Sequence, residues 1–96
     1  MEIARVTATV VATRKCEELN GYKLLLVEFL NPDMTPKGGK TVAVDQVDAG
    51  IGEIVLIVQG SSARRATTVG EKPVDAAVVA VIDEISSGRK TLYKKG

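Results

Sequence analysis

The chain contains no histidine and no tryptophan, and its 96 residues include one cysteine, one phenylalanine and two tyrosines. Histidine is the side chain that most often transfers protons in catalysis near neutral pH, so its absence argues against an enzyme. A single cysteine, Cys16, excludes an internal disulfide and fits a reducing cytoplasm. No apolar run approaches the roughly 18 residues that a membrane-spanning helix needs. These absences predict a soluble cytoplasmic protein without catalytic activity.

The sequence also gives little support for a charged binding partner or for a bound metal. Basic and acidic residues nearly balance, and the net charge of +1 gives no electrostatic argument for nucleic acid or an anionic membrane as a partner. A metal site needs clustered cysteine, histidine or carboxylate side chains. The sequence Cys16-Glu17-Glu18 has no second cluster at ligand spacing, so we expect a charged turn there. We predict neither a metal nor a cofactor.

The chain is instead rich in aliphatic residues. Apolar residues make up 45% of it, and most of them are Val, Ile, Leu or Ala. This composition favours β-strands. The length suits one domain with a single core, and no linker, internal repeat or low-complexity tract divides it. We therefore predict one β-rich domain over residues 1–96.

Strict alternation of apolar and polar residues predicts a first strand over Ile3–Thr13. The residues expected on its inward face are Ala4, Val6, Ala8, Val10 and Ala12. Such small side chains suit a tightly curved sheet or a narrow barrel. Further strands are predicted at Lys23–Leu30, Thr41–Asp45, Glu53–Gln59 and Ala76–Ile82. The last segment could instead form a helix beginning at Asp75, but its β-branched residues favour a strand.

Residues typical of turns separate these strands. Asn31–Gly39 predicts an exposed hairpin loop, and Ser86–Gly88 predicts a turn. Thr91–Tyr93 could add a C-terminal edge strand. Five or six short strands separated by such turns predict an all-β protein built as a small β-barrel.

The stretch from Gly50 to Arg64 combines a glycine turn, an apolar strand and a signal for the start of a helix. Ile54–Val58 is apolar without alternation, so both faces of that strand need cover. Gly60 ends the strand, and one short helical turn is expected to follow, because serine caps the N-terminus of a helix well. The residues of this turn are Ser61, Ser62, Ala63 and Arg64.

The same stretch could also be interpreted as a binding site. Gly50–Glu53 resembles half of a phosphate-binding loop, but the lysine and helix that should follow are missing, so a structural tight turn is favoured. Ser61 and Ser62 near Arg64 could bind an anion at a helix N-terminus. Capping of the turn, with Arg64 in an ion pair between subunits, is the preferred interpretation. Asp45, Glu53 and Asp83 are expected to be hydrogen-bonded structural carboxylates or interface partners.

An argument for self-association comes from the second, fourth and fifth predicted strands, which are apolar on both faces. A small barrel hides only one face of each strand, and the sequence offers no long amphipathic helix to cover the other. Burying a Val, Leu or Ile side chain stabilises a protein by roughly 1.5–3 kcal/mol, so several such residues would support an obligate interface between copies. A loop that folds back over one face is the alternative.

Several motifs occur in order along nearly the whole chain. They are Val10–Lys15, Leu24–Val27, Val42–Asp45, Ala49–Glu53, Gly60–Arg64, Pro73–Asp75 and Val81–Asp83. Together they resemble the small vertex proteins of bacterial microcompartment shells, which are found in carboxysomes and in ethanolamine- or propanediol-type metabolosomes. The Gly-Ser-Ser-Ala-Arg motif, with the glycine–glutamate turn before it, is highly specific.

The resemblance implies a five-stranded barrel of the oligonucleotide-binding (OB) topology that does not bind oligonucleotides. Proteins of that family are structural rather than catalytic. Their subunits form a cyclic ring, typically a homopentamer, that closes the vertices of an icosahedral shell. Hexameric shell proteins of a different fold tile its facets. The chain is therefore expected in the cytoplasm, in the shell of a bacterial microcompartment.

The resemblance, together with the strand that is apolar on both faces, predicts a subunit interface. Its expected residues are Gly50, Gly52, Glu53, Gly60, Ser61, Ser62, Ala63 and Arg64. The family usually has glycine where this chain has Asp48, which would add five carboxylates to each ring. If this loop borders the central opening, then Asp48, Ala49 and Gly50 lie there. A benign substitution in a surface turn is the alternative.

A competing hypothesis is a small-barrel module that binds nucleic acid or a small ligand. Barrels that bind single strands stack bases on exposed aromatic rings and follow the phosphates with a basic groove. The scattered aromatic residues Tyr22, Phe29 and Tyr93 and the balanced charge argue against such a module.

Overall fold

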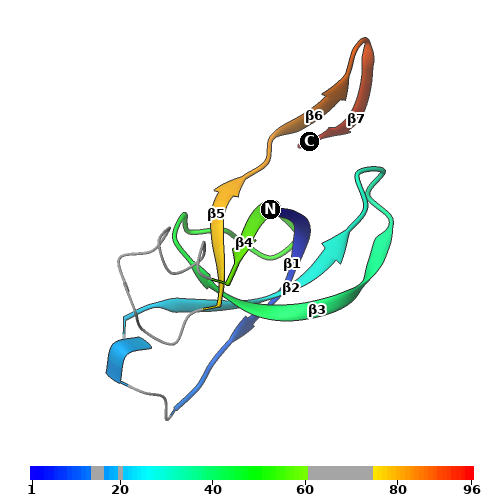
Figure 1. Ribbon diagram of the computed structural model, residues 1–96. Coiled ribbons are helices and arrows are strands. Elements are labelled where there is room, and N and C mark those ends of the chain that lie inside the picture. The colour runs from blue at the N-terminus through cyan, green and yellow to red at the C-terminus, as the bar shows by residue number, and fades with distance from the viewer. Residues whose placement is uncertain (14–16, 20, 61–74) are drawn as a thin grey trace.

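A computed structural model describes residues 1–13, 17–19, 21–60 and 75–96 of the chain (Figure 1). Its elements in chain order are β1 (Glu2–Val10), the 3₁₀ turn η1 (Glu17–Leu19), β2 (Lys23–Leu30), β3 (Pro36–Asp45), β4 (Ile54–Gln59), β5 (Ala76–Val81), β6 (Glu84–Ser87) and β7 (Lys90–Lys94). The described part of the chain is thus nearly all-β, as predicted. β2 has its predicted bounds, and β5 is a strand rather than a helix.

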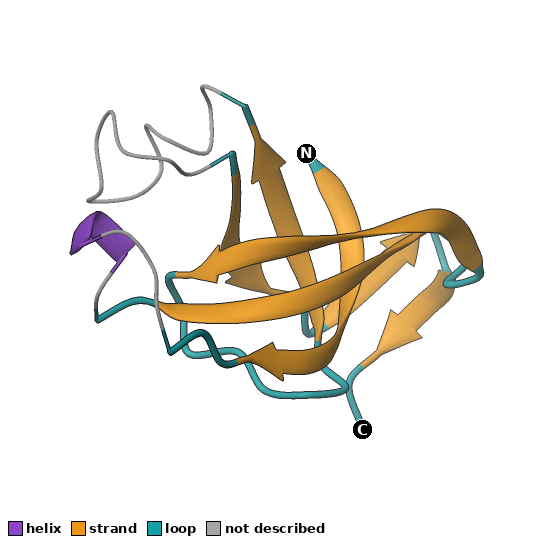
Figure 2. Cartoon of the chain, turned by 90° about the horizontal axis from the view of Figure 1, so that it is seen from below, coloured by secondary structure: helices purple, strands orange, loops and turns teal. Residues whose placement is uncertain are grey.

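Strands β1 to β5 close into a barrel in the order β1-β2-β3-β5-β4, and β4 pairs with β1 to complete it (Figures 1 and 2). Neighbouring strands run antiparallel, except that β3 and β5 run parallel where Val44 lies opposite Ala77. This arrangement is the five-stranded Greek-key barrel of the OB-fold. The predicted barrel of that topology is confirmed.

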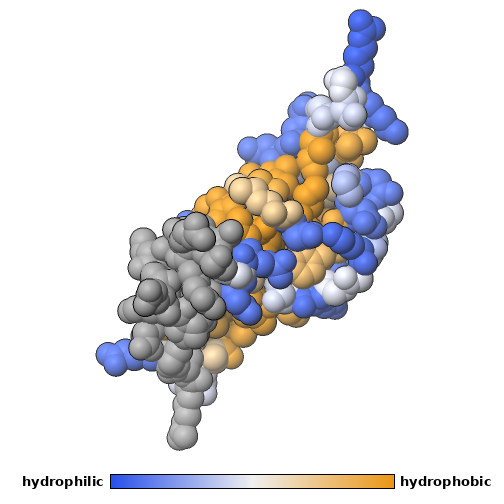
Figure 3. Space-filling view, viewed as in Figure 1, coloured by the Kyte–Doolittle hydropathy of each residue, from blue (hydrophilic) through white to orange (hydrophobic). Residues whose placement is uncertain are grey.

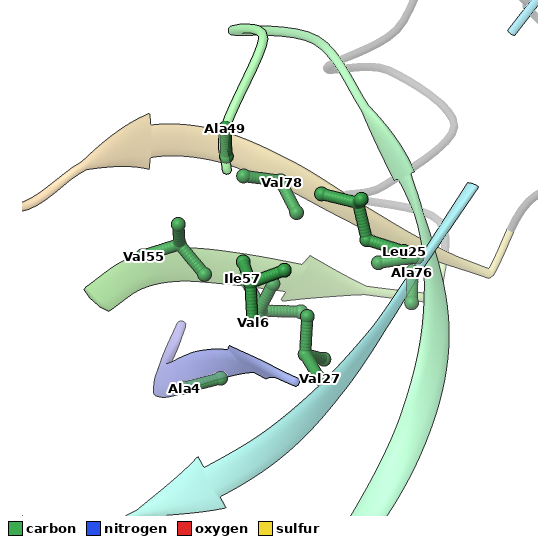
Figure 4. Close-up of a cluster of buried hydrophobic side chains, with 10 residues drawn as sticks. Ala4, Val6, Leu25, Val27, Ala49, Val55, Ile57, Ala76 and Val78 are labelled. Carbon is green, nitrogen blue, oxygen red and sulfur yellow. The ribbon is translucent and has the colours of Figure 1, made fainter. Parts of the chain in front are cut away.

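The barrel interior is filled by small and medium aliphatic side chains that point toward one another (Figure 4). The buried cluster consists of Ala4, Val6, Leu25, Val27, Ala43, Ala49, Val55, Ile57, Ala76 and Val78. Every barrel strand contributes to it, and Ala49 comes from the connection between β3 and β4. Because the barrel is narrow, such side chains fill it without leaving a channel.

The register of β1 shifts between Val6 and Ala8, where Thr7 is an extra residue whose hydroxyl donates a 3.2 Å hydrogen bond to the Leu26 carbonyl. A one-residue shift moves each later side chain to the opposite face of a strand. Ala8 therefore lies opposite Leu26 and is only partly buried. The predicted inward face is wrong for Ala8 and Val10, and the strand ends at Val10, before the predicted Ala12 and Thr13.

β3 begins at Pro36 rather than at the predicted Thr41. Proline is tolerated at the first residue of a strand, where no N–H is needed. Gly38 and Gly39 remain within the strand at positive φ angles of 89° and 111°, which glycine adopts without steric cost. The turn before β3 is correspondingly shorter than the predicted loop Asn31–Gly39.

β6 and β7 form a two-stranded hairpin that is separate from the barrel sheet and projects from it (Figure 1). Its turn lies at Gly88 and Arg89, so the predicted turn Ser86–Gly88 is misplaced, because Ser86 and Ser87 pair with β7. The predicted C-terminal strand Thr91–Tyr93 lies within β7, and its partner is β6.

η1 lies in the connection between β1 and β2, where the sequence predicted only a charged turn. The helical turn predicted after Gly60 falls on Ser61–Arg64, which lie outside the described residues.

Candidate functional site

The connection between β3 and β4, residues 46–53, is held by a buried carboxylate. Asp45 ends β3 and is 8% exposed, and its two oxygens accept hydrogen bonds from the backbone N–H groups of Val47 at 3.0 Å and Ala49 at 2.9 Å. Lys23 Nζ lies 3.6 Å from the same carboxylate and donates to the Ala49 carbonyl at 2.8 Å. Because these bonds pair the polar groups at this end of the loop, they fix its conformation. Asp45 is the hydrogen-bonded structural carboxylate that the sequence predicted.

Glu53 has the same role at the other end of the loop. Its Oε1 accepts a 2.6 Å hydrogen bond from the N–H of Gly50, and its Oε2 accepts one from Lys95 Nζ near the C-terminus. The hydrogen bond from Lys95, followed by the one from Gly50, lowers the pKa of Glu53. The same bond to Glu53 raises the pKa of Lys95. A Cβ atom at Gly50 would lie 3.4 Å from Oε1, which is an ordinary van der Waals distance.

The described residues of the predicted interface fall into two groups. Gly50, Gly52 and Glu53 lie at the start of β4, beside the bulge of β1, where Gly52 N–H donates to the Val6 carbonyl at 2.8 Å. Gly60 lies beyond the other end of β4, a strand of six residues that spans about 20 Å at roughly 3.3 Å per residue. The remaining predicted residues, Ser61, Ser62, Ala63 and Arg64, lie outside the described residues. The two groups lie at opposite ends of one strand and do not meet within a chain.

The three residues predicted near a central opening differ in exposure. The Asp48 side chain is 94% exposed, lies 3.2 Å from Lys23 Nζ, and belongs to a residue with a positive φ of 58°. Ala49 is fully buried in the barrel core. Gly50 has no side chain, so of the three only Asp48 presents a side chain to solvent.

The outside of the barrel carries apolar side chains that are not fully buried. Val42 is 44% exposed and pairs with Leu26, which also lies opposite Ala8. On the other side of the barrel, Leu56 pairs with Ala80. Figure 3 shows apolar side chains gathered over β4 and β5. These outward-facing residues agree with the prediction that the second, fourth and fifth strands, β2, β4 and β5, are apolar on both faces.

A second apolar cluster lies outside the core, at the η1 end of the barrel. Its members are Val44, Val58 and Ala77, with Leu19, Tyr22, Leu24 and Val79 packed against them. Leu19 and Tyr22 come from the connection before β2, so this connection covers part of the second face. A loop that folds back over one face, the alternative to self-association, is therefore present at this end, but among the described residues it covers only part of that face.

A groove of about 190 Å³ lies beside this cluster, and we call it the η1 groove. It is lined by Leu19, Leu24, Val42, Ala43, Val44, Asp75 and Ala76. The walls are aliphatic, and Asp75 is exposed. Glu17 is also exposed and lies on η1, which supplies Leu19. The groove is therefore apolar with carboxylates nearby.

Two further hollows lie at the N-terminal end of β1, and both include Glu2 and Gln59 in their lining. Lys37 Nζ donates to the two oxygens of Glu2 at 2.9 and 2.8 Å, and this bond lowers the pKa of Glu2. Among the described residues, no group of three or more cysteine or carboxylate side chains is placed to hold a metal ion. No helix in the same residues is long and apolar enough to cross a membrane.

The family described as "Ethanolamine utilisation protein EutN/carboxysome" matches residues 1–83 of the chain. The chain belongs to this family. The matched segment contains the whole barrel and ends just before β6. The resemblance noted in the sequence is therefore confirmed.

Individual members of the EutN/carboxysome family match over almost the full chain. The carboxysome shell vertex protein CcmL of Synechocystis sp. is 44% identical over 95 residues, which cover 99% of this chain and 95% of CcmL. The solved structure of an ethanolamine utilization protein, EutN, superposes with a TM-score of 0.94 at 42% identity and covers 99% of each chain. The pentameric microcompartment shell protein GrpN of Rhodospirillum rubrum has a TM-score of 0.80 at 44% identity, over 91% of this chain and 98% of GrpN.

Two lysines that organise the loop were not singled out from the sequence. Lys23 begins β2 directly opposite Asp45, so the opposite charges at the facing ends of two predicted strands were a usable signal. Lys95 reaches Glu53 only because the hairpin returns the chain to the barrel, and no local pattern shows this contact.

Proposed function

We propose that this chain is a structural, non-enzymatic shell protein that caps the vertices of an icosahedral bacterial microcompartment as a homopentamer. Its partners are other copies of itself and the hexameric shell proteins of the facets, and it works within the shell in the cytoplasm. The observation that carries the proposal is the near full-length relationship to a carboxysome shell vertex protein.

The surface of the barrel supports assembly. Outward-facing apolar side chains on β1 to β5 are left partly uncovered in a single chain, and covering them against another copy would be favourable. The carboxylates Asp45 and Glu53 serve loop structure, which agrees with a protein that performs no chemistry.

We propose that the two groups of predicted interface residues lie on opposite sides of one seam. In a ring, each contact is heterologous, so that one patch of a subunit meets a different patch of the next. The group at Gly50, Gly52 and Glu53 would then face the segment Gly60–Arg64 of the neighbouring copy. Within one chain, Gly60 lies at the other end of β4 from Gly50, Gly52 and Glu53, which suits this arrangement.

Native mass spectrometry at micromolar protein concentration tests the assembly. The expected species has five times the 10.2 kDa mass of the subunit. A monomer under these conditions would contradict the vertex function. Co-expression with hexameric shell proteins and electron microscopy of the product test the proposed place at vertices, since omission of this chain should leave shells open or misshapen.

The residues of the seam are tested separately. Arg64→Ala and Ser62→Ala should lower the thermal stability of the pentamer and the fraction assembled at low protein concentration. Unchanged values for both variants would remove Gly60–Arg64 from the seam and leave the pentamer untouched. A salt-dependent titration with single-stranded DNA is the matched test of the competing hypothesis, and we expect no binding.

We also propose that Asp48 borders the central opening of the ring. The exposed carboxylate at the surface of the 46–53 loop supports this placement. In a pentamer, five such groups would make the opening more negative. Asp48→Gly should then alter the ion preference of the opening in a planar-bilayer or vesicle flux measurement, whereas an unchanged preference would place Asp48 elsewhere.

A further inference from the structure

The hairpin β6–β7 has too little packing of its own to account for its projecting position. A two-stranded hairpin is at best marginally stable in water without further packing. No residue of the segment 82–96 is fully buried, and neither β6 nor β7 pairs with a barrel strand. Packing against another surface would therefore stabilise this hairpin.

The base of the hairpin is fixed, which gives the hairpin a defined direction. Ile82 N–H donates to the Ile54 carbonyl at 2.8 Å, and Lys95 N–H donates to the Asp83 carbonyl at 2.8 Å. The Lys95 side chain is bound to Glu53. Both strands of the hairpin are therefore tied to the start of β4, while the turn at Gly88 and Arg89 extends away from the barrel (Figure 1).

The two faces of the hairpin differ. Ile85 lies opposite Tyr93, so their partly buried side chains share one face. Glu84 lies opposite Lys94, so these oppositely charged residues share the other face. The turn is cationic, because Arg89 and Lys90 follow each other and are both exposed. The hairpin thus has an apolar face that leads to a basic tip.

The η1 groove has complementary properties and lies at the other end of the molecule. Its walls are aliphatic, and the exposed carboxylates of Glu17 and Asp75 belong to the segments that form it. In Figure 1, η1 and the start of β5 lie at one end, and β6–β7 lies at the opposite end. A hairpin therefore cannot reach the groove of its own chain, but it can reach the groove of another copy.

We infer that the hairpin β6–β7 of one copy packs its Ile85–Tyr93 face into the η1 groove of the next copy, with Arg89 and Lys90 beside the groove carboxylates. This inference rests on the proposed ring and identifies the surfaces that join its subunits. Two different patches at opposite ends of a molecule make a head-to-tail contact, which closes into a ring when the rotation between subunits permits. The contact also brings the Glu53 end of one copy toward the Asp75 end of the next.

Cross-linking tests the contact in the full chain. In a Cys16→Ser background, a double variant with Tyr93→Cys and Val42→Cys is treated with a short bismaleimide and analysed on a denaturing gel. We expect a ladder of covalent species that reaches five subunits. Each single variant serves as a control and should give no covalent dimer, because identical residues do not meet in a head-to-tail contact.

The outcomes separate this inference from the proposed function. A pentamer by native mass spectrometry with no ladder would overturn the hairpin contact and leave the vertex function in place. A monomer by native mass spectrometry would overturn the vertex function itself. A covalent dimer from the Tyr93→Cys single variant would show an isologous contact between hairpins and would also overturn the inference.

A charge exchange provides a second, independent measurement. Arg89→Glu should weaken each contact, by up to about fivefold in its association constant for a solvent-exposed pair at low salt. Adding Asp75→Lys should restore assembly, whereas adding Asp48→Lys, which restores the same net charge on another loop, should not. Equal restoration by both would indicate a net-charge effect and would contradict the pairing.

Discussion

The barrel and the C-terminal hairpin are made of the same element, the antiparallel strand pair, but their stability has different sources. Each barrel strand has two neighbours and contributes to the buried cluster. The strands β6 and β7 have only each other, and no residue of the segment 82–96 is fully buried. The comparison indicates that the barrel can persist in a single chain, whereas the hairpin depends on its base and on what packs against it.

The family relationship shows the same division. The family match ends at residue 83, after the barrel and before the hairpin. Individual relatives nevertheless align over 95 residues, so the hairpin region has counterparts in them. The family match thus covers the closed barrel, and the hairpin lies outside it.

The largest expected effect compares the same truncation in both regions. Leu25 is fully buried in the barrel, so Leu25→Ala should lower the free energy of unfolding by about 2–5 kcal/mol. Leu92 in β7 is only partly buried, and Leu92→Ala should cost about 1 kcal/mol or less. Urea unfolding of both variants at one fixed protein concentration measures the difference. Equal losses would mean that hairpin and barrel unfold as one unit.

The barrel was predictable because its strands are marked by local patterns. The run Lys23–Leu30 is mostly apolar and bounded by turn residues, and its bounds were predicted correctly. The bulge at Thr7 was not, since the alternation of β1 continues through it without interruption. What places Ala8 outside is the pairing with β2, which is a tertiary property.

The errors at β3 and at the hairpin turn have the opposite origin. Pro36, Gly38 and Gly39 are residues of turns by local preference, but the long partner strand β2 keeps them in a ladder. In the same way, Ser86 and Ser87 are held in strand by pairing with β7. Local turn chemistry was overridden in both places by a strand partner that the sequence alone does not position.

The candidate site was predictable in its parts but not in its arrangement. Asp45 and Glu53 were expected to be structural carboxylates because they bound apolar strands, and both are hydrogen-bonded. The groove could not be foreseen, since it forms where η1 returns to the outer face of β2 and β3. Its position relative to the hairpin follows from barrel closure.

A second prediction concerns the loop on the barrel side of the hairpin base. Asp45→Ala removes the acceptor for the Ala49 N–H, which lies in the core region, and should cost about 1–3 kcal/mol of stability. Asp48→Asn is the control, because it removes only the exposed pair with Lys23 and should change stability by less than about 1 kcal/mol. Thermal unfolding followed by circular dichroism measures both. A control as destabilised as Asp45→Ala would mean that Lys23 organises the loop through Asp48.

A third prediction concerns the Glu53–Lys95 pair, which joins hairpin and barrel. The pKa of Glu53 is lowered in the folded protein, chiefly by Lys95, so the stabilisation is present above the ordinary glutamate pKa of about 4.3 and is lost as pH falls toward the lowered value. The protection of the β6 and β7 amides, taken as the intrinsic exchange rate at each pH divided by the observed rate, should therefore fall in this acidic range, while the protection of Leu25 and its barrel neighbours stays high.

Glu53→Gln is the matched variant for this test. It keeps a side-chain oxygen that can accept the Gly50 N–H but loses the charge that binds Lys95. Its hairpin amides should be less protected at neutral pH, and their protection should change little further on acidification. A hairpin that responds to acid equally in both proteins would show that another group controls its attachment.

The smallest expected effect belongs to Asp48, which touches neither the core nor the hairpin base. Its φ of 58° lies in the left-handed region, which glycine adopts freely and aspartate adopts more readily than most residues. Asp48→Gly should therefore change the free energy of unfolding by less than about 1 kcal/mol, because relief at this φ is offset by the greater entropy of glycine in the unfolded chain. Alanine has neither the freedom of glycine nor the tolerance of aspartate at this φ. Asp48→Ala should therefore be less stable than Asp48→Gly by roughly 1 kcal/mol. If alanine proved equal to glycine in urea unfolding, the positive φ would not be what selects the residue at this position, and its exposed charge would remain the reason for aspartate here.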